Sequence, residues 1–341
     1  MTVEGAAELR DALQSALASG EVREGRPVRV EGLEILGDFV MSRVFAGREA
    51  DRPVVVKAVK PRADLGDHLM REWRVLRALR QAVEEGDLPA HVAPEPIAVI
   101  DDPPAVVLSR MPGRRLDASM SAAIRFPWRL FRMGSLVRDF DATVRSLAAV
   151  AAVLSARPPV VDAAGESLSA IAARQRADGA WDGELEEGVL ELAVALGTGA
   201  PEGGFKHGNF APWNVVVGPE GAAVIDFQET ERPGTWLDDI AQMMIHLEIA
   251  GAQGGLKPGQ VRTLCAALFR SAAVCAEENS LPTPDEGALN ARYLHELCRM
   301  HSWYTAAAPE GSRQGLRPRA DAVGFLVRRF VESGGSERPW S

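Results

Sequence analysis

The feature that most constrains the fold is a change of hydrophobic pattern near residue 112. Before that point the chain consists mainly of short runs rich in β-branched and apolar residues, separated by turn residues such as Gly37-Asp38. Runs of this kind predict antiparallel strands. One stretch, 64–81, instead repeats apolar residues at spacings of three and four, which predicts a helix. The predicted strands span 28–36, 40–45, 53–59, 97–100 and 105–108.

Beyond Met111-Pro112-Gly113 the pattern becomes mainly helical. The main helical stretches are 136–156, 168–176 and 185–196, with more helices from Trp236, and a short strand pair is predicted at 215–217 and 223–225. Strands followed by helices predict an α+β chain with two lobes. We expect an antiparallel-sheet N-lobe over 28–112 and a mainly helical C-lobe over 113–333, preceded by a helical extension, 1–27, and followed by a frayed tail, 334–341.

Composition narrows the class of partner. The 341 residues carry a formal net charge of −9, which argues against a nucleic-acid binder, because phosphate backbones are held by clustered Lys and Arg. A neutral or cationic small molecule fits this charge better. The three cysteines lack paired spacing, the N-terminus lacks the pattern of a signal peptide, and the most apolar tract, 147–154, is too short to cross a bilayer. We therefore expect a cytoplasmic protein without a membrane partner.

Two charged residues of the N-lobe are predicted to meet. Lys57 closes the apolar run 54–57, and Glu72 lies on the predicted helix that follows. A lysine on a strand and a glutamate on the next helix can pair, which directs the ammonium group at phosphate oxygens. Taken singly, Lys57 could extend its ammonium group to solvent from a strand end, and Glu72 could belong to a solvated helix face.

Two polar side chains flank the predicted strand pair of the C-lobe. Asn214 ends the segment 207–214, HGNFAPWN, and Asp226 follows the second strand in the run 224–227, VIDF. We expect these side chains to lie on either side of the strand pair and to share a metal ion. Amide and carboxylate oxygens suit Mg²⁺, which takes its other ligands from water and substrate phosphates.

These elements resemble the aminoglycoside phosphotransferase and choline kinase family, whose signature is HGDxxxxN followed by an IDF or IDW motif. The resemblance covers about 28–246 and implies a protein-kinase-like fold that uses ATP and Mg²⁺. It implies that Lys57 binds the α and β phosphates and that Glu72 holds Lys57. Asn214 and Asp226 would be the metal ligands, and Asn214, Asp226 and the residue at position 209 would serve catalysis.

The resemblance also assigns roles to residues outside the signature. The stretch 109–113 would be the hinge that receives the adenine through backbone groups, with Ser109 and Met111 as contacts. Asp239 would brace the catalytic loop, which we define as residues 207–214. His207 would act as a packed brace of the same loop rather than as an acid or base.

The phosphate-covering loop of the family is poorly represented. The family places this loop between its first two strands, and the corresponding stretch, 37–43, offers only one glycine. Backbone groups there could still cover phosphates if Ser42 or Arg43 assisted them.

The chain departs from the signature at Asn209, where the family has an aspartate that orients the attacking hydroxyl and accepts its proton. Asparagine can accept a hydrogen bond but cannot take the proton. Loss of a general base costs about 10² to 10⁴ in rate. Three explanations stay open: an engineered change that traps a complex, a natural loss that leaves a pseudokinase, or a tolerated variant in a slow enzyme. We expect Mg·ATP binding to survive, because the phosphate and metal ligands are present.

Two functions are consistent with these features. The leading hypothesis is an ATP- and Mg²⁺-dependent phosphotransferase that acts on a hydroxyl of a small metabolite or antibiotic, with cationic compounds among the candidates. The alternative is a nucleotide-binding pseudokinase, an adaptor or a peptide-directed kinase, with a peptide or protein partner.

Two charged segments bear on the choice between them. An acidic run beside the predicted helix 185–196 could line a pocket for a polyamine or aminoglycoside, or could be a solvated helix face. A basic, aromatic segment, 125–132, could bind an acidic peptide, or could form an amphipathic helix with its aromatic side chains inward. The acidic residues are Asp182, Glu184, Glu186, Glu187 and Glu191.

Overall fold

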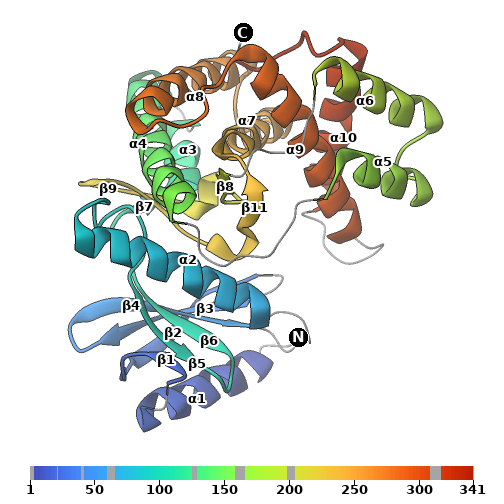
Figure 1. Ribbon diagram of the computed structural model, residues 1–341. Coiled ribbons are helices and arrows are strands. Elements are labelled where there is room, and N and C mark those ends of the chain that lie inside the picture. Colours follow the sequence, from blue (N-terminus) through green and yellow to red (C-terminus); the bar gives the residue numbers. More distant parts are fainter. Residues whose placement is uncertain are drawn as a thin grey trace.

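The computed structural model describes residues 4–20, 22–39, 42–59, 66–124, 129–157, 166–197, 204–307 and 316–340. One lobe is built on a sheet and the other is built mainly of helices (Figure 1). This arrangement confirms the predicted α+β class, with an antiparallel-sheet N-lobe and a mainly helical C-lobe.

The N-lobe is a six-stranded antiparallel sheet in the order β1-β5-β6-β4-β3-β2. Helices α1 (Glu4–Ser19) and α2 (Gly66–Glu85) cover its two faces (Figure 1). Because side chains alternate along a strand, Val107 packs in the cluster that contains α1 residues, and Val106 packs in the cluster that contains α2 residues. The strands are β1 (Glu24–Gly25), β2 (Glu31–Asp38), β3 (Ser42–Glu49), β4 (Arg52–Val59), β5 (Pro96–Ile100) and β6 (Ala105–Ser109).

The C-lobe is arranged around α7 (Trp236–Ala252), which is buried along nearly its whole length. A helix that is buried on all sides needs neighbours on all sides. Helices α8 (Pro258–Asn279), α9 (Glu286–Ala307) and α10 (Arg317–Glu332) supply them, together with α4 (Arg129–Ala156). The remaining helices are α3 (Leu116–Ile124), α5 (Leu168–Ala177) and α6 (Gly183–Ala195).

Two small sheets lie on the side of the C-lobe helices that faces the N-lobe (Figure 1). The hairpin of β9 (Val215–Gly218) and β10 (Gly221–Val224) pairs with β7 (Arg114–Arg115). Strand β8 (Gly204–Lys206) pairs with β11 (Glu231–Gly234). Short 3₁₀ turns at Pro212–Asn214 and Phe227–Glu229 follow directly on the segments that carry the predicted site.

The structure differs from the sequence prediction at short elements and at the C-terminal end. Strands β1, β7, β8 and β11 have two to four residues each, which is too short for a hydrophobic period to be visible. Residues 334–340, which the sequence predicts as a frayed tail, fold back so that Trp340 is buried in edge-to-face contact with Tyr293. None of the helices in the described ranges combines the length and hydrophobicity needed to cross a membrane.

Candidate active site

Lys57 and Glu72 form a buried ion pair between the sheet and α2. Val56 and Ala58 point into the cluster that contains α1, so Lys57 between them points to the opposite face, where α2 lies. The Nζ atom of Lys57 lies 2.9 Å from Oε2 of Glu72, and both side chains are at least nine-tenths buried. The structure thus brings together the two N-lobe residues that the sequence predicts to pair.

Lys57 also reaches across to the C-lobe, where its ammonium group donates to Asp226. Burial by itself would lower the pKa of Lys57, but the carboxylates of Asp226 and Glu72 outweigh it, so the pKa is raised. The ammonium group therefore stays charged, and it links the two lobes at the point where phosphate oxygens would be bound.

Asp226 and Asn214 lie next to each other because of the register of the β9–β10 hairpin. Val215 pairs with Val224, and the hairpin closes with a hydrogen bond of 3.0 Å from the Ile225 N–H to the Asn214 carbonyl. Asp226 has a left-handed backbone, with φ of 68°. That region is costly for most side chains and tolerated by aspartate, and such outliers gather at functional sites.

The donor set of Asn214 and Asp226 fits a magnesium ion. The side-chain amide nitrogen of Asn214 donates to the Asn209 carbonyl at 2.8 Å, so its Oδ1 atom is directed away from that bond. The Asp226 side chain is partly exposed, at 29%. One amide oxygen and one carboxylate can hold Mg²⁺ when phosphates and water complete its octahedron.

The catalytic loop is held from below by Asp239 of α7. Its carboxylate accepts the backbone N–H groups of His207 at 2.8 Å and Gly208 at 3.0 Å. Burial raises the pKa of Asp239 to about 8, against the opposing effect of these two donors. Gly208 has a φ of +84°, and a Cβ atom there would lie 1.9 Å from the Glu229 carbonyl oxygen, so only glycine fits.

His207 is a neutral packing residue in this geometry. Its Nε2 atom faces the Ile225 carbonyl at 3.0 Å, and its Nδ1 atom accepts the Asn209 N–H at 3.3 Å. A carbonyl can only accept, so Nε2 carries the proton and Nδ1 does not. Burial lowers the pKa of His207 to about 4. These contacts are those of a loop brace.

Asn209 itself is partly exposed at the top of the loop. Its backbone is fixed at both ends, by the bond from Asn209 N–H to His207 and by the bond from Asn214 to the Asn209 carbonyl. The side chain that stands in the place of the family's aspartate is therefore presented on a rigid loop.

The stretch predicted as the hinge follows a central strand, β6. The N–H of Ser109 donates to Glu95, and the Glu95 N–H donates to the Ser109 hydroxyl at 2.8 Å instead of to its carbonyl. The Arg110 N–H is used by Pro53, and Met111 follows beyond the last strand pair. Ser109 thus ends β6, and Met111 lies just beyond the end of this strand.

The predicted phosphate-covering loop is described only in part, because residues 40 and 41 lie outside the described residues. Ser42 is buried and pairs with Val59, on the same face of the sheet as Lys57. Arg43 is buried and donates to Asp38 at 3.0 Å. Ser42 therefore lies on the same face of the sheet as Lys57, one strand away, and the two side chains form no hydrogen bond among the described residues.

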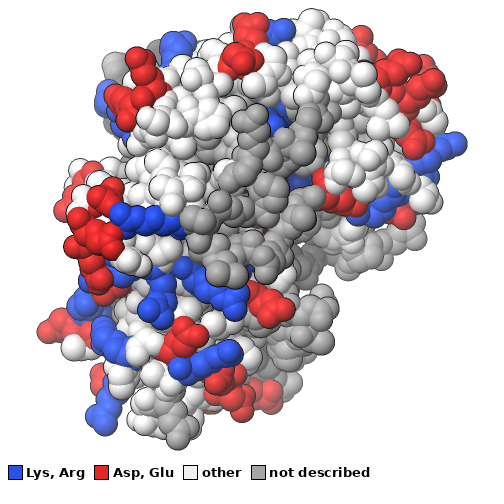
Figure 2. All heavy atoms as spheres, in the orientation of Figure 1, with Lys and Arg blue, Asp and Glu red and all other residues white. Residues whose placement is uncertain are grey.

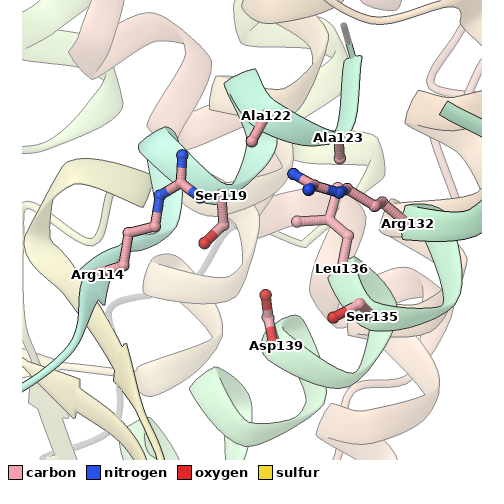
Figure 3. A pocket seen from close by; sticks show the side chains of 8 residues that line it. All are labelled: Arg114, Ser119, Ala122, Ala123, Arg132, Ser135, Leu136 and Asp139. Carbon is pink, nitrogen blue, oxygen red and sulfur yellow. The ribbon is translucent and has the colours of Figure 1, made fainter. Parts of the chain in front are cut away.

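A separate hollow of about 260 Å³ lies between α3 and α4. Figure 3 shows Arg114 and Arg132 reaching over it from opposite sides, with Asp139 beneath them. None of the predicted site residues lines it, and its volume is below that of typical ligand pockets. It is not part of the candidate site.

The comparison with known families decides the identity of the fold. The model of the phosphotransferase enzyme family matches residues 32–268, well over half of the chain. This chain belongs to the phosphotransferase enzyme family. The resemblance inferred from the HGNFAPWN and VIDF segments is therefore confirmed. No curated protein matches the sequence.

Solved structures agree with this family assignment. The aminoglycoside phosphotransferase APH(4)-Ia shares 15% identity over 96% of this chain and 99% of that chain, with a TM-score of 0.60. Amicoumacin kinase hAmiN, solved with AMP-PNP, Ca²⁺ and Ami, shares 12% identity over 100% and 98%, with a TM-score of 0.60. A choline/ethanolamine kinase family protein from Mesorhizobium loti shares 14% over 96% and 100%, with a TM-score of 0.59. These likenesses confirm the protein-kinase-like fold of this phosphotransferase-family chain.

Two further residues support the catalytic loop of this phosphotransferase-family chain, and sequence reasoning missed both. Gln242 of α7 donates to the Gly208 carbonyl at 3.1 Å and accepts the Phe210 N–H, and Arg299 of α9 donates to the same Gly208 carbonyl at 2.8 Å. The spacing of Gln242 from Asp239 places them on one helix face and was a usable signal. Nothing in the sequence around Arg299 distinguishes it from a surface arginine.

Proposed function

We propose that this protein transfers the γ-phosphoryl group of ATP to a hydroxyl of a small molecule in a Mg²⁺-dependent reaction. The observation that supports this best is the contact of Lys57 with both Glu72 and Asp226, next to Asn214. Phosphoryl transfer is catalysed mainly by positioning and by positive charge around the phosphates. This cluster supplies both at the junction of the two lobes.

Each predicted residue has a role in this proposal. Lys57, oriented by Glu72, would bind phosphate oxygens. Asn214 and Asp226 would hold Mg²⁺, which would supply positive charge against the phosphates. Ser109 and Met111 would bind the adenine through backbone groups. The amicoumacin kinase structure contains AMP-PNP and a divalent cation, which supports the same ligand classes here.

Asn209 would orient the acceptor hydroxyl without removing its proton. The hydroxyl oxygen bonds to the γ phosphorus, the bond from that phosphorus to the bridging oxygen of ADP breaks, and the hydroxyl proton passes to water or to the transferred phosphate. In a loose transition state proton removal is late, so transfer is slowed rather than abolished, by about 10² to 10⁴. We propose a slow phosphotransferase.

The test combines nucleotide binding and transfer. Calorimetric titration with ATP, with and without Mg²⁺, should show binding that Mg²⁺ strengthens. Labelled-phosphate transfer to a panel of small hydroxyl acceptors should be weak in the unmodified chain and higher by orders of magnitude in Asn209→Asp. Absence of ATP binding in both forms would refute the proposal.

The neutral side chain of Asn209 favours a second candidate, a nucleotide-binding pseudokinase or adaptor with a peptide or protein partner. ATP binding without transfer by either form would support it over the first. The basic segment 125–132, on which a peptide partner was predicted, lies largely outside the described residues. We also propose a cytoplasmic location, which the free and buried thiols of Cys265, Cys275 and Cys298 support.

A further inference from the structure

The C-lobe side of the catalytic loop is contacted by two arginines from different helices. Arg299 of α9 donates to the Gly208 carbonyl, directly before Asn209. Arg319, in the first turn of α10, places its guanidinium carbon 4.9 Å from the centroid of the Trp213 ring, directly before Asn214. Both arginines thus contact the residue directly before a proposed site residue, Asn209 or Asn214.

The two arginines differ in how their charge is compensated. Arg299 is paired with the buried carboxylate of Glu296 at 2.8 Å. Arg319 contacts the Trp213 ring and the Tyr304 hydroxyl, and within the described ranges no carboxylate lies at ion-pair distance from it. A guanidinium group has five N–H donors in a planar fork, and a ring face and one phenol oxygen use few of them.

The position of Arg319 is unfavourable for the helix that carries it. The first turn of α10 contains Arg317 and Arg319 and no acidic residue. Positive side chains at a helix N-terminus oppose the helix dipole and are destabilising by about 0.3 to 1 kcal/mol each. Stability of α10 therefore does not explain why a cation lies here, against the loop.

His246 of α7 lies beneath Trp213 as a neutral group. It is buried and packs edge-to-face on the Trp213 ring, with 4.6 Å between centroids. Burial lowers the pKa of His246 to about 3, and Arg319 and Arg299 lower it in the same direction, with Glu296 opposing. The cation next to Trp213 is therefore Arg319 and not His246, and its positive charge is local, since the whole chain has a net charge of −9.

The acidic run that suggested a cationic acceptor lies elsewhere. Glu184, Glu187 and Glu191 are exposed on α6, and Figure 2 shows acidic side chains gathered at the outer edge of the molecule where α6 lies. Asp182 pairs with Arg328, and Glu186 lies near Arg176. This surface has the character of a solvated helix face.

Helix α9 also carries an exposed aromatic side chain near Arg299. Trp303 follows Arg299 by one helical turn on α9 and is 48% exposed. A large exposed ring one turn from Arg299 suits the apolar or planar body of a small molecule.

Taking the proposed phosphotransfer as its basis, we propose that the acceptor carries a carboxylate or phosphate group, which Arg319 binds while the acceptor hydroxyl lies at Asn209. The body of the acceptor packs along Trp303. Arg319 is thus the residue that selects an anionic hydroxy compound over an amino alcohol. Its planar fork can bind either anion with two hydrogen bonds.

The experiment uses matched acceptors that differ only in charge. One set is 4-(hydroxymethyl)benzoate, 4-(hydroxymethyl)phenyl phosphate and 4-(hydroxymethyl)benzylamine, and an aliphatic set is 4-hydroxybutyrate and 4-aminobutanol. Binding to the Mg·ADP-loaded chain is measured by calorimetry, and transfer from Mg·ATP is measured in Asn209→Asp. We expect at least one anionic compound to bind, and the amines to bind at least tenfold more weakly. Comparison of the benzoate with the phosphate ester distinguishes the two anions.

Variants then locate the selectivity. Arg319→Gln should raise the KM of anionic acceptors by about 10 to 100-fold, the range expected for hydrogen bonds to a charged group, with ATP affinity unchanged. The KM of anionic acceptors in Arg319→Lys should fall between the values of the parent and of Arg319→Gln. Arg317 is an exposed arginine on the same turn, and Arg317→Gln should leave this KM unchanged. Thermal unfolding checks that each variant folds.

The outcomes separate this inference from the proposed function. If amines bind as well as or better than anions, or if Arg319→Gln folds and leaves the acceptor KM unchanged, the inference is wrong even when transfer occurs. If none of the anions binds the Mg·ADP-loaded chain, it is wrong as well. Loss of ATP binding in the unmodified chain would instead refute the proposed function.

Discussion

The two sides of the catalytic loop use buried charge in opposite ways. On the side of the proposed nucleotide site, Lys57 is shared by two carboxylates, Glu72 and Asp226. These two negative charges exceed the single positive charge of Lys57, and a metal ion would offset the difference. On the C-lobe side, Glu296 is shared by two cations, Lys206 and Arg299, and Arg319 lies over the Trp213 ring. The loop between them carries the neutral side chain of Asn209.

This difference separates the tasks of the two sides. The nucleotide side needs negative ligands for a metal ion and a cation for phosphates. The C-lobe side needs a rigid loop and, as we infer, a positive surface for the acceptor. Substitutions on one side should therefore change ATP affinity, and substitutions on the other side should change turnover, acceptor affinity or stability.

The largest effect is expected for Asp226→Asn in the Asn209→Asp background. Asparagine tolerates the left-handed backbone at this position, so the fold should persist. A bound metal ion contributes several kcal/mol to transition-state stabilisation, so transfer should fall by about 10³ or more. Labelled-phosphate transfer measures this, and calorimetry should show that Mg²⁺ no longer strengthens ATP binding.

A matched control for this variant is Glu229→Gln, which neutralises a partly exposed carboxylate near His68. It should leave both measurements unchanged. If Mg²⁺ strengthened ATP binding equally in Asp226→Asn and in the parent, the metal ion would be held elsewhere. The proposed difference between the two sides of the loop would then be wrong.

A smaller effect on the same side is expected for Glu72→Gln. The amide keeps the shape of the side chain but frees Lys57 to bind Asp226 alone, which turns the ammonium group away from the phosphates. ATP affinity should fall by about 10 to 100-fold, the range for hydrogen bonds to charged groups. Glu84→Gln, an exposed acid on the same helix, is the control. Unchanged ATP affinity in Glu72→Gln would show that the pair is only structural.

On the loop side, Asp239→Asn should reduce stability by about 1 to 3 kcal/mol. An amide offers one acceptor oxygen to two backbone N–H groups, so either His207 or Gly208 loses its partner. Denaturant unfolding measures the loss, and turnover should fall while ATP affinity changes less than threefold. Asp321→Asn, an exposed acid on α10, serves as the control. A large loss of ATP affinity would mean that the two sides are not separable.

The smallest effect lies outside both sides, at His301 of α9. Its Nδ1 atom faces the Trp181 indole N–H at 3.1 Å and the Gln175 side-chain oxygen at 2.8 Å, and burial lowers the pKa of His301 to about 4. The unfolded chain, with a pKa near 6.5, binds the proton first, so stability is full above about pH 6.5 and is lost as pH falls towards 4. The loss should be about 1 kcal/mol per pH unit.

His301→Asn removes this titration and keeps an acceptor for Trp181. Its unfolding free energy, measured between pH 5 and 7.5, should vary less with pH than that of the parent. ATP affinity at pH 7.5 should be the same in both. Identical pH profiles would show that His301 is not buried as a neutral group.

The sequence predicted the nucleotide side better than the C-lobe side, for a physical reason. Lys57 and Glu72 lie on a strand and a helix, and Asn214 and Asp226 flank a hairpin, so strand alternation and hairpin register determine which residues meet. Gln242 and Arg299 support the loop from helices whose packing partners are remote in sequence. The sequence pattern of such a helix is the same whether its polar residue faces a carbonyl group or solvent.

Net charge is equally uninformative about a local site. The value of −9 was the basis for expecting a neutral or cationic acceptor, but charge summed over a surface says little about one loop. The pairing of Glu296 with Lys206 and Arg299 joins residues far apart in the chain, so no local pattern announces it. Short strands such as β7 and β8 escaped prediction because they are stabilised by their partners rather than by their own composition.

The Gly208 carbonyl receives donors from α7 and α9, and one residue later the Asn209 carbonyl receives the amide of Asn214. A shift of α9 that accompanies acceptor binding would therefore move the peptide that orients a metal ligand. The acceptor and ATP would then affect each other's binding free energy without direct contact. Thermodynamic linkage requires this effect to be equal in both directions. An acceptor that tightens ATP must itself be tightened by ATP, by the same factor.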